Sequence, residues 1–393
     1  MSAQTCPICN SVHFSTLLKR EQVPVHQNLI LATREAALAV ARGDLDFVLC
    51  QDCGFVFNRA FDLSLLAYGK DYDNTQTCSD YFDDYLNGLV KYLVEEQGLR
   101  NSTIVEVGCG KGHFLRKFVN YPDTNNRGIG FDPSYVGPDS ELEGRLIFRR
   151  CYYDDSCTDV QADAVVCRHV IEHVPEPLAL LKTVRSALDN SPQAKVFFET
   201  PCVDWILHNK VIWDFFYEHC SLFTKNSLRT AFEAAGFSVK NIRHIFNGQY
   251  LWLEATTDAT KNKTKKNYND SNLPKLAAEY LKSEQQERST WKTKLEFLRQ
   301  QGSISIWGAG AKGSTFANLI DSNQSLIDCV VDLNPKKQGH YIAGTGHLIV
   351  SPFDISKRRI CSAILMNPNY REENMRLLSD LGITLNLVDW NHS

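Results

Sequence analysis

The sequence has no long apolar run and no long block of basic residues. Its start, Met1 to Pro7, has neither the basic region nor the apolar stretch of a secretory leader. No segment approaches the roughly 20 apolar residues that span a bilayer. The formal net charge is -4, so a phosphate backbone would gain little from this surface. These absences predict a cytoplasmic protein that binds neither membrane nor nucleic acid.

The cysteines are numerous and partly ordered. The chain has 393 residues, enough for two or three domains of roughly 100 to 200 residues each, and contains 13 cysteines. In a cytoplasmic protein these are free thiols or metal ligands rather than disulfides. Cys6/Cys9 and Cys50/Cys53 form two C-x-x-C pairs. They predict a structural zinc site closed by four thiolates; the alternatives are unligated thiols or a redox pair.

A glycine-rich turn follows the β-branched run Thr103–Val107. Glycines let the backbone turn tightly and approach a ligand, and the next helix offers its N-terminus. An acid precedes the first glycine, and Asp132 ends the next apolar run, where it can hold ribose hydroxyls. An acid before the turn suits the cationic amino acid part of S-adenosylmethionine better than the pyrophosphate of NAD. The residues assigned to this cofactor are Glu106, Gly108, Gly110, Gly112 and Asp132.

Apolar runs and helix-like segments alternate from residue 104 to about residue 255. The runs are 103–107, 128–131, 164–167, 195–199 and 250–254, and the helix-like segments include Leu178–Leu188 and Ser227–Ala235. This alternation predicts an α/β fold with a doubly wound parallel sheet. The polar stretch Thr257 to Ser271 is expected to be a linker, and a charged helical pattern follows it to Leu298.

A second glycine turn lies near the end of the chain. Ser303–Trp307 leads into Gly308-x-Gly310-x-x-Gly313, and Asp332 follows a further apolar run. Three interpretations remain open: an NAD site, a site for another diphosphate, or a turn needed only for packing. Too little chain follows for a complete dinucleotide domain. A Rossmann-like half-domain is therefore favoured, in which Lys312 can meet a phosphate.

Aromatic, acidic and histidine residues are concentrated after the apolar run at 195–198. Loops at the carboxyl ends of parallel strands hang over the ligand, so this stretch is expected to form the substrate pocket. If the stretch Tyr217-Glu218-His219 is extended, Tyr217 and His219 share one face. Methylating carbon requires prior deprotonation beside a carbonyl, for which His219 is a candidate base and Tyr217 a candidate donor to the enolate. Structural roles for all three residues remain the alternative.

The string His169-Val-Ile-Glu-His173 matches a metalloprotease motif. That motif needs both histidines on one helix, whereas Pro175 and Pro177 follow here at once. We therefore expect these histidines to lie near the methyl donor, where they line the pocket or pack against the sheet.

Together these motifs resemble the sugar C-methyltransferases of deoxysugar biosynthesis, and the resemblance covers nearly the whole chain. Its specific parts are the block Trp213-Asp-Phe-Phe-Tyr-Glu-His219 and the C-terminal segments Trp307–Gly313 and Gly344–His347. The resemblance also includes the four cysteines, Glu106–Gly112, His169–His173 and Gly248–Glu254.

The resemblance implies a zinc-binding domain (1–70), a class I methyltransferase domain (71–256), a linker and helix (257–285), and a Rossmann-like sugar-nucleotide domain (286–393). It implies a nucleotide-linked 4-keto sugar as substrate and His219 as the base that abstracts the proton beside the ketone. The implied catalytic residues are His219, Tyr217, Glu218, His173 and Tyr72. His169 joins the cofactor residues, and the implied substrate-binding residues are Trp213, Gly308, Gly310, Lys312 and Gly313.

Two other functions stay open at this point. One is a methyltransferase of the same architecture that acts on oxygen, nitrogen or a non-sugar acceptor. The other is a zinc-ribbon protein that binds nucleic acid, which the acidic balance disfavours. Whether the third or the fifth sugar carbon is methylated is not determined by the sequence, nor is the nucleotide. A monomer is expected.

Overall fold

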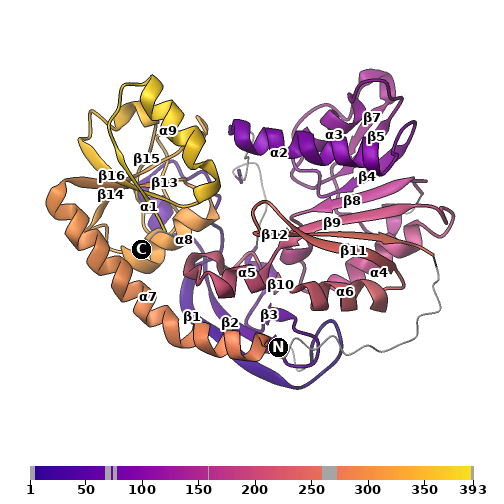
Figure 1. Cartoon of the computed structure of the whole chain (residues 1–393), viewed down its shortest axis with the longest axis horizontal. Coiled ribbons are helices and arrows are strands. Elements are labelled where there is room, and N and C mark those ends of the chain that lie inside the picture. Colours follow the sequence, from indigo (N-terminus) through magenta and orange to yellow (C-terminus); the bar gives the residue numbers. More distant parts are fainter. Residues whose placement is uncertain (1–4, 67–71, 74–77, 158, 259–271, 391–393) are drawn as a thin grey trace.

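The computed structural model of the chain consists of three sheets with their helices (Figure 1). It describes residues 5–66, 72–73, 78–157, 159–258 and 272–390. The linker predicted at 257–271 lies largely outside the described residues. Among those that are described, no helix is both long and apolar enough to cross a bilayer.

The largest sheet has eight strands in the order β11-β12-β9-β8-β4-β5-β7-β6. Its parallel strands are β4 (Thr103–Val107), β5 (Arg127–Phe131), β7 (Leu146–Arg149), β8 (Ala164–Arg168) and β9 (Lys195–Pro201). Its antiparallel strands are β6 (Ser140–Glu141), β11 (Ser238–Ile245) and β12 (Tyr250–Thr256). The predicted doubly wound sheet is confirmed. The parallel orientation of the run 250–254 was wrong, because β12 returns through a hairpin with β11.

Helices cover both faces of this sheet. Apolar residues of α4 (Pro177–Ala187) and α6 (Lys225–Ala234) pack on one face. Those of α2 (Asp80–Lys91) and α3 (His113–Val119) pack on the other. The apolar side chains of each central strand point alternately to these two layers, so the continuous hydrophobic runs noted in the sequence are required by a sheet buried on both sides.

The N-terminal sheet is antiparallel and is completed by a strand from far along the chain. Its strands are β1 (Phe14–Pro24), β2 (Arg42–Cys50) and β3 (Val56–Asn58), with the short helix α1 (Arg34–Leu38) before β2. Strand β10 (Ser221–Leu222) pairs with β3. The segment directly before β10 is therefore held by the N-terminal sheet.

The C-terminal sheet has five parallel strands in the order β15-β14-β13-β16-β17. These are β13 (Ser303–Trp307), β14 (Ile327–Val331), β15 (Ile349–Val350), β16 (Ile360–Leu365) and β17 (Asn386–Asp389), with helices α8 (Ala311–Ile320) and α9 (Arg371–Asp380). This order, with β13 central, confirms the predicted Rossmann-like unit. Helix α7 (Leu273–Gln301) runs through the domain boundary expected at residue 286, because no glycine or proline interrupts it before Gly302.

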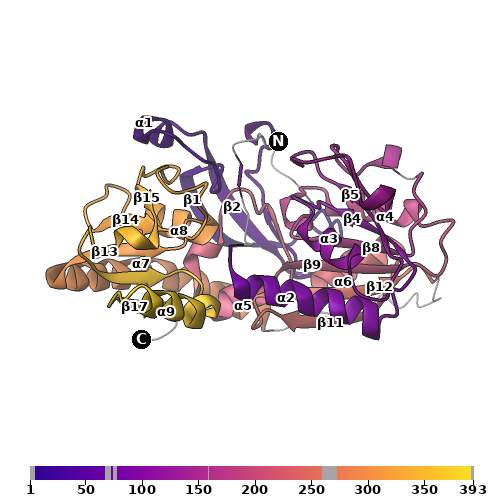
Figure 2. The same ribbon diagram turned by 90° about the horizontal axis from the view of Figure 1, so that it is seen from above.

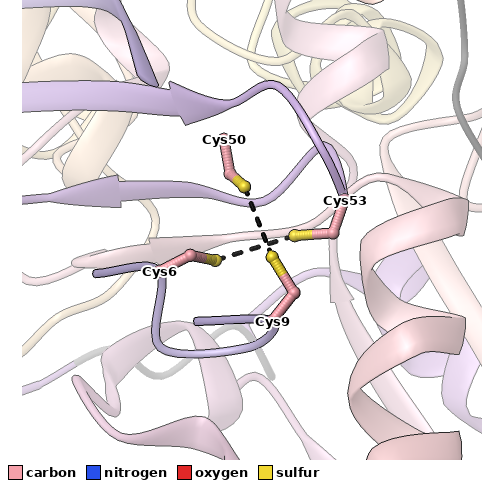
Figure 3. Close-up of side chains that lie close together, drawn as sticks. All are labelled: Cys6, Cys9, Cys50 and Cys53. Carbon is pink, nitrogen blue, oxygen red and sulfur yellow. Dashed lines mark hydrogen bonds between the residues drawn. The ribbon is translucent and has the colours of Figure 1, made fainter. Parts of the chain in front are cut away.

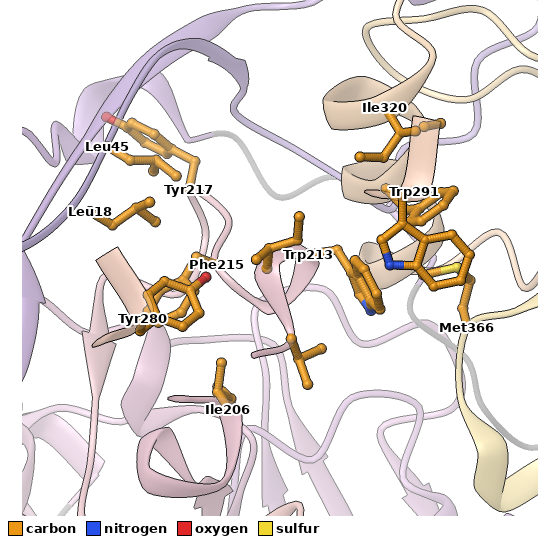
Figure 4. Packing of buried hydrophobic residues seen from close by; sticks show 14 of the residues in the cluster. Leu18, Leu45, Ile206, Trp213, Phe215, Tyr217, Tyr280, Trp291, Ile320 and Met366 are labelled. Carbon is orange, nitrogen blue, oxygen red and sulfur yellow. The ribbon is translucent and has the colours of Figure 1, made fainter. Parts of the chain in front are cut away.

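A core shared by the N-terminal sheet, the C-terminal sheet and the segment 203–217 lies at the centre of the molecule, where α5 (Val203–His208), β1, α7 and α8 meet (Figures 1, 2 and 4). Trp213 packs edge-on against Trp291 of α7 and Phe316 of α8, with ring centroids 5.7 and 5.2 Å apart. The side chain is buried and absent from the cavity lining described below. The substrate-binding role expected for Trp213 is therefore replaced by a packing role, because a large apolar ring gains more from this core than from a polar pocket.

Removing this ring should destabilise the whole chain. We expect Trp213→Ala to cost about 3 to 5 kcal/mol of unfolding free energy, the range for deleting a buried aromatic side chain. The control Phe353→Ala removes a side chain that is 66% exposed and should change stability by less than about 0.5 kcal/mol. Denaturant unfolding followed by fluorescence and circular dichroism measures both. Equal stability of the two variants would contradict the packing role.

Candidate active site

A cavity of about 300 Å³ lies where the carboxyl ends of β8 and β9 face the first turn of α8. The eight-stranded sheet contributes the loop after β8 and the start of β12. The C-terminal sheet contributes its glycine turn and the loop after β14. The N-terminal region contributes Asn28 and Tyr72. Tyr72, one of the expected site residues, lines the cavity.

The segment from residue 213 to 219 forms one wall of the cavity. Its side chains point alternately to the shared core and to the cavity. Trp213, Phe215 and Tyr217 point into the shared core, whereas Asp214 and Phe216 line the cavity. The backbone then turns, since the His219 amide donates to the Phe216 carbonyl at 3.3 Å. The turn brings Glu218 and His219 to the cavity together.

Tyr217 does not reach the cavity. Its hydroxyl accepts from the Asp62 amide at 2.7 Å and its ring packs 5.3 Å from that of Phe61. The expectation that Tyr217 and His219 share a face was therefore wrong, because that expectation assumed an extended strand where the structure has a turn.

His219 is held as a neutral imidazole. Burial, followed by the nearby His173, His169 and Lys312, lowers its pKa well below the usual value. The His173 ring stands 4.8 Å away at 87°, and the Phe216 ring lies 4.1 Å away. A neutral imidazole beside a cavity can accept a proton throughout the physiological pH range.

Glu218 is fully buried and anchored to the N-terminal region. One carboxylate oxygen accepts from the Gln27 amide at 3.0 Å, and the other lies 3.4 Å from Nδ1 of His26. The ring of His26 in turn lies 6.0 Å from that of Tyr72. The residue next to the candidate base is thus positioned by another part of the chain.

His169 carries charge where His219 does not. Its ring nitrogens lie 3.3 Å from Glu172 and 3.0 Å from Glu199. Burial opposes protonation, but these two carboxylates outweigh it and raise the pKa of His169 to about 9. Burial likewise opposes ionisation of Glu199, yet Arg168 and His169 lower its pKa to about 2. The loop after β8 is thus fixed by a charged network at the edge of the cavity.

The first glycine turn fits the expected methyl donor. Its three glycines at 108, 110 and 112 have φ of 71°, 54° and 75°, a region that favours glycine. Asp132 accepts from the Gly110 amide at 2.8 Å and from Ser134. Glu106 is 3% exposed, and its Oε2 has no hydrogen-bond partner. Burial raises the pKa of this carboxyl to about 8. A buried carboxyl group near the end of β4, with one oxygen that has no hydrogen-bond partner, fits the cationic part of S-adenosylmethionine.

The second glycine turn opens onto the cavity, which Gly308, Gly310, Lys312 and Gly313 all line. A Cβ on Gly313 would lie 1.9 Å from the Gly308 carbonyl oxygen, so packing alone requires glycine there. Lys312 forms an ion pair of 2.9 Å with Asp214 and donates to Gln249 at 3.2 Å. This pair joins α8 to the segment that carries His219.

Several cavity residues had no predicted role. Asp214 lay inside the aromatic block and could have been chosen by its charge. Gln249 precedes β12 within the segment 248–254 that the resemblance includes. No sequence pattern indicated a role for Asn28 or Asn334, because only the packing of distant segments brings them to the cavity.

The four paired cysteines meet in one cluster (Figure 3). Their sulfur atoms lie within 4.8 Å of one another, with Cys6–Cys53 at 3.7 Å and Cys9–Cys50 at 3.5 Å. Four thiolates about 2.3 Å from a tetrahedral zinc ion are about 3.8 Å apart. The cluster therefore fits zinc, in a closed site that joins the N-terminal loop to the end of β2.

The cluster gives a prediction for metal content. We expect one zinc per chain, and expect Cys53→Ser to lose it and to melt at lower temperature, because the N-terminal sheet is tied together at this point. Cys361→Ser, which changes an exposed cysteine, should keep both metal and stability. Elemental analysis and thermal melting test this. A full zinc complement in Cys53→Ser would contradict it.

The His169 network gives a pH dependence. The folded pKa of about 9 exceeds the unfolded value of about 6.5. The contribution of protonated His169 to the folding stability is therefore complete below pH 6.5 and is lost as pH rises through 9. We expect the stability difference between the wild type and His169→Gln to shrink across that window in denaturant unfolding. A difference that does not change with pH would contradict the charged network.

Comparison with known proteins gives two domain matches. Residues 80–242 match the model described as "Methyltransferase domain", and residues 274–382 match "C-methyltransferase C-terminal domain". A tRNA U34 carboxymethyltransferase of Campylobacter fetus is 23% identical over 204 residues, 49% of this chain and 69% of that protein. A ubiquinone biosynthesis O-methyltransferase of Idiomarina loihiensis is 32% identical over 109 residues, 26% of this chain and 44% of that protein.

A solved structure, the 1,6-didemethyltoxoflavin-N1-methyltransferase of Burkholderia thailandensis, is 15% identical and covers 45% of this chain and 81% of its own. Its TM-score is 0.35, too low to support an inference. The two domain matches, with the doubly wound sheet and its glycine turn, identify the chain as an S-adenosylmethionine-dependent methyltransferase that carries a C-methyltransferase C-terminal domain.

Proposed function

We propose that the chain methylates carbon beside the ketone of a nucleotide-linked 4-keto-deoxysugar. The observation that carries this proposal is a neutral, half-buried histidine, His219, at a cavity between the methyltransferase sheet and the C-terminal sheet. Carbon has no lone pair with which to attack a methyl group, so a C-methyltransferase needs such a base. The match of residues 274–382 to a C-methyltransferase C-terminal domain supports the same reaction.

In this reaction His219 removes the proton from the carbon next to the ketone. The imidazole is neutral because burial and neighbouring positive groups disfavour its charged form, so its lone pair is available. The bound S-adenosylmethionine supplies the methyl group that the enolate carbon then receives. The developing enolate oxygen needs hydrogen-bond donors, and the polar groups of His173 and Tyr72 line the same cavity.

Glu218 and Tyr217 act indirectly, because they fix the position of His219. Glu218 holds the turn against the N-terminal region through the Gln27 amide. Tyr217 fixes the same turn through a second contact with the N-terminal region, at Asp62. Both contacts set where His219 stands, and a displacement of about 1 Å at a base can cost roughly 100-fold in rate.

The nucleotide diphosphate is proposed to bind at the second glycine turn. Gly308, Gly310 and Gly313 bring the backbone of α8 to the cavity, and a helix N-terminus favours anions. Lys312 adds a positive charge next to this turn. The Asp214 carboxylate, 2.9 Å away, holds Lys312 toward the sugar end of the cavity.

The remaining assignments follow from the same arrangement. Glu106, the first glycine turn, Asp132 and His169 are proposed to bind the methyl donor, and the four cysteines a structural zinc ion. A monomer is proposed as the active unit.

Mass spectrometry of purified protein with S-adenosylmethionine and thymidine-, guanosine- and cytidine-diphosphate 4-keto-deoxysugars tests the proposal. We expect one added methyl group on carbon. His219→Ala should lower the rate about 10²- to 10⁴-fold, the usual contribution of a general base, with donor binding unchanged. The matched control His208→Ala, at the exposed end of α5, should keep full activity.

Two results would contradict this proposal. The first is methylation on oxygen or nitrogen, which would move the chain to the other class of acceptor. The second is an active His219→Ala variant, since an acceptor that is itself nucleophilic needs no carbon base. Tyr217→Phe keeps the ring and removes the hydroxyl, so it should lose activity only through the position of His219, with a smaller effect than His219→Ala.

A further inference from the structure

Three metal-ligating side chains meet in the cavity, far in sequence from the cysteine cluster. Glu172, His173 and His219 each offer one ligand atom, and these atoms lie within 4.8 Å of one another. Glu172 and His173 belong to the short helical turn Ile171–His173. Ser221, two residues after His219, donates its hydroxyl to the Val174 carbonyl at 2.7 Å. This bond holds the two ligand-bearing segments together.

The donor set is typical of divalent transition metals. Two imidazoles and one carboxylate suit zinc, nickel and cobalt, and three protein ligands leave a coordination position open. All three residues line the cavity, so the open position faces the space where substrate is proposed to bind. Ligand atoms around such an ion are separated by about 3 to 3.5 Å, which small side-chain rotations can reach from the observed spacing.

The surroundings of the cluster are compatible with added positive charge. Glu172 is fully buried, and its Oε2 accepts from the Thr200 hydroxyl at 3.1 Å, a contact that orients the carboxylate. The Lys312 cation is paired with Asp214 at 2.9 Å. His169 is paired with Glu199 at 3.0 Å and also lies 3.3 Å from Glu172, so a bound metal ion would share the Glu172 carboxylate with His169.

We propose that Glu172, His173 and His219 form a second metal site, specific for divalent transition ions, and that its occupancy stops methyl transfer. The reason is that a single lone pair of His219 serves both roles. An imidazole nitrogen that coordinates a metal ion cannot accept a proton from carbon. The binding half of this proposal is independent of the proposed function, and only the inhibitory half depends on it.

The cysteine cluster and the cavity site should prefer different metal ions, so that each can be tested separately. Four thiolates, three of them buried, retain zinc, whereas a site of imidazole and carboxylate accepts nickel readily. Nickel added to protein whose cysteine cluster already holds zinc therefore reports on the cavity site alone.

The test is a calorimetric titration of nickel into untagged, zinc-loaded protein, with zinc content measured before and after. We expect one nickel per chain, with at least about tenfold weaker binding in His173→Ala, in His219→Ala and in Glu172→Gln. His208→Ala should bind as the wild type does. S-adenosylmethionine binding and thermal melting confirm that each variant is folded.

Absence of a nickel site in the wild type would overturn the proposal, as would binding that survives all three substitutions. In the activity arm, nickel at the concentration that fills the site should abolish methyl transfer, and a chelator should restore it. Stimulation by nickel would overturn the inhibitory half. If no methyl transfer is found for any acceptor, the proposed function fails while the binding isotherms still decide the metal site.

Discussion

Burial of Trp213, Phe215 and Tyr217 in the core between the N-terminal and C-terminal sheets is the constraint on which the site depends. These alternate side chains fix one edge of the segment, so the residues between them face the cavity. The turn that ends the alternation then places Glu218 and His219 side by side in the cavity wall. The proposed base, on an otherwise irregular segment, is thereby positioned by hydrophobic packing rather than by regular secondary structure.

Each part of the chain holds this segment by a different contact. Arg20 of β1 donates to the carbonyls of Ile212 and Phe215 at 2.6 and 3.0 Å, and pairs with Glu284 of α7 at 2.9 Å. Strand β10 joins the end of the segment to the N-terminal sheet. The pair of Lys312 with Asp214 adds the C-terminal domain. All three parts of the chain therefore hold the segment that carries His219.

The sequence predicted what is local. An apolar run such as Thr103–Val107 and the glycines after it predict a strand and a turn at those same residues. The eight-stranded sheet and the C-terminal Rossmann-like sheet were both predicted from such patterns. The orientation of Tyr250–Thr256 was not predictable, because a hairpin and a crossover leave the same apolar run. Tyr217 was misplaced because alternation holds only in extended backbone, and Trp213 because aromatic residues serve cores and pockets alike. Asn28 reaches the cavity through tertiary packing alone.

In the proposed mechanism, His219 takes a proton from carbon before any methyl group is transferred. The most direct measurement is deuterium exchange at the carbon next to the ketone, in heavy water, with the 4-keto sugar nucleotide and no methyl donor. We expect exchange with wild-type protein that His219→Ala abolishes and His208→Ala retains. Exchange that is equally fast with His219→Ala would contradict it.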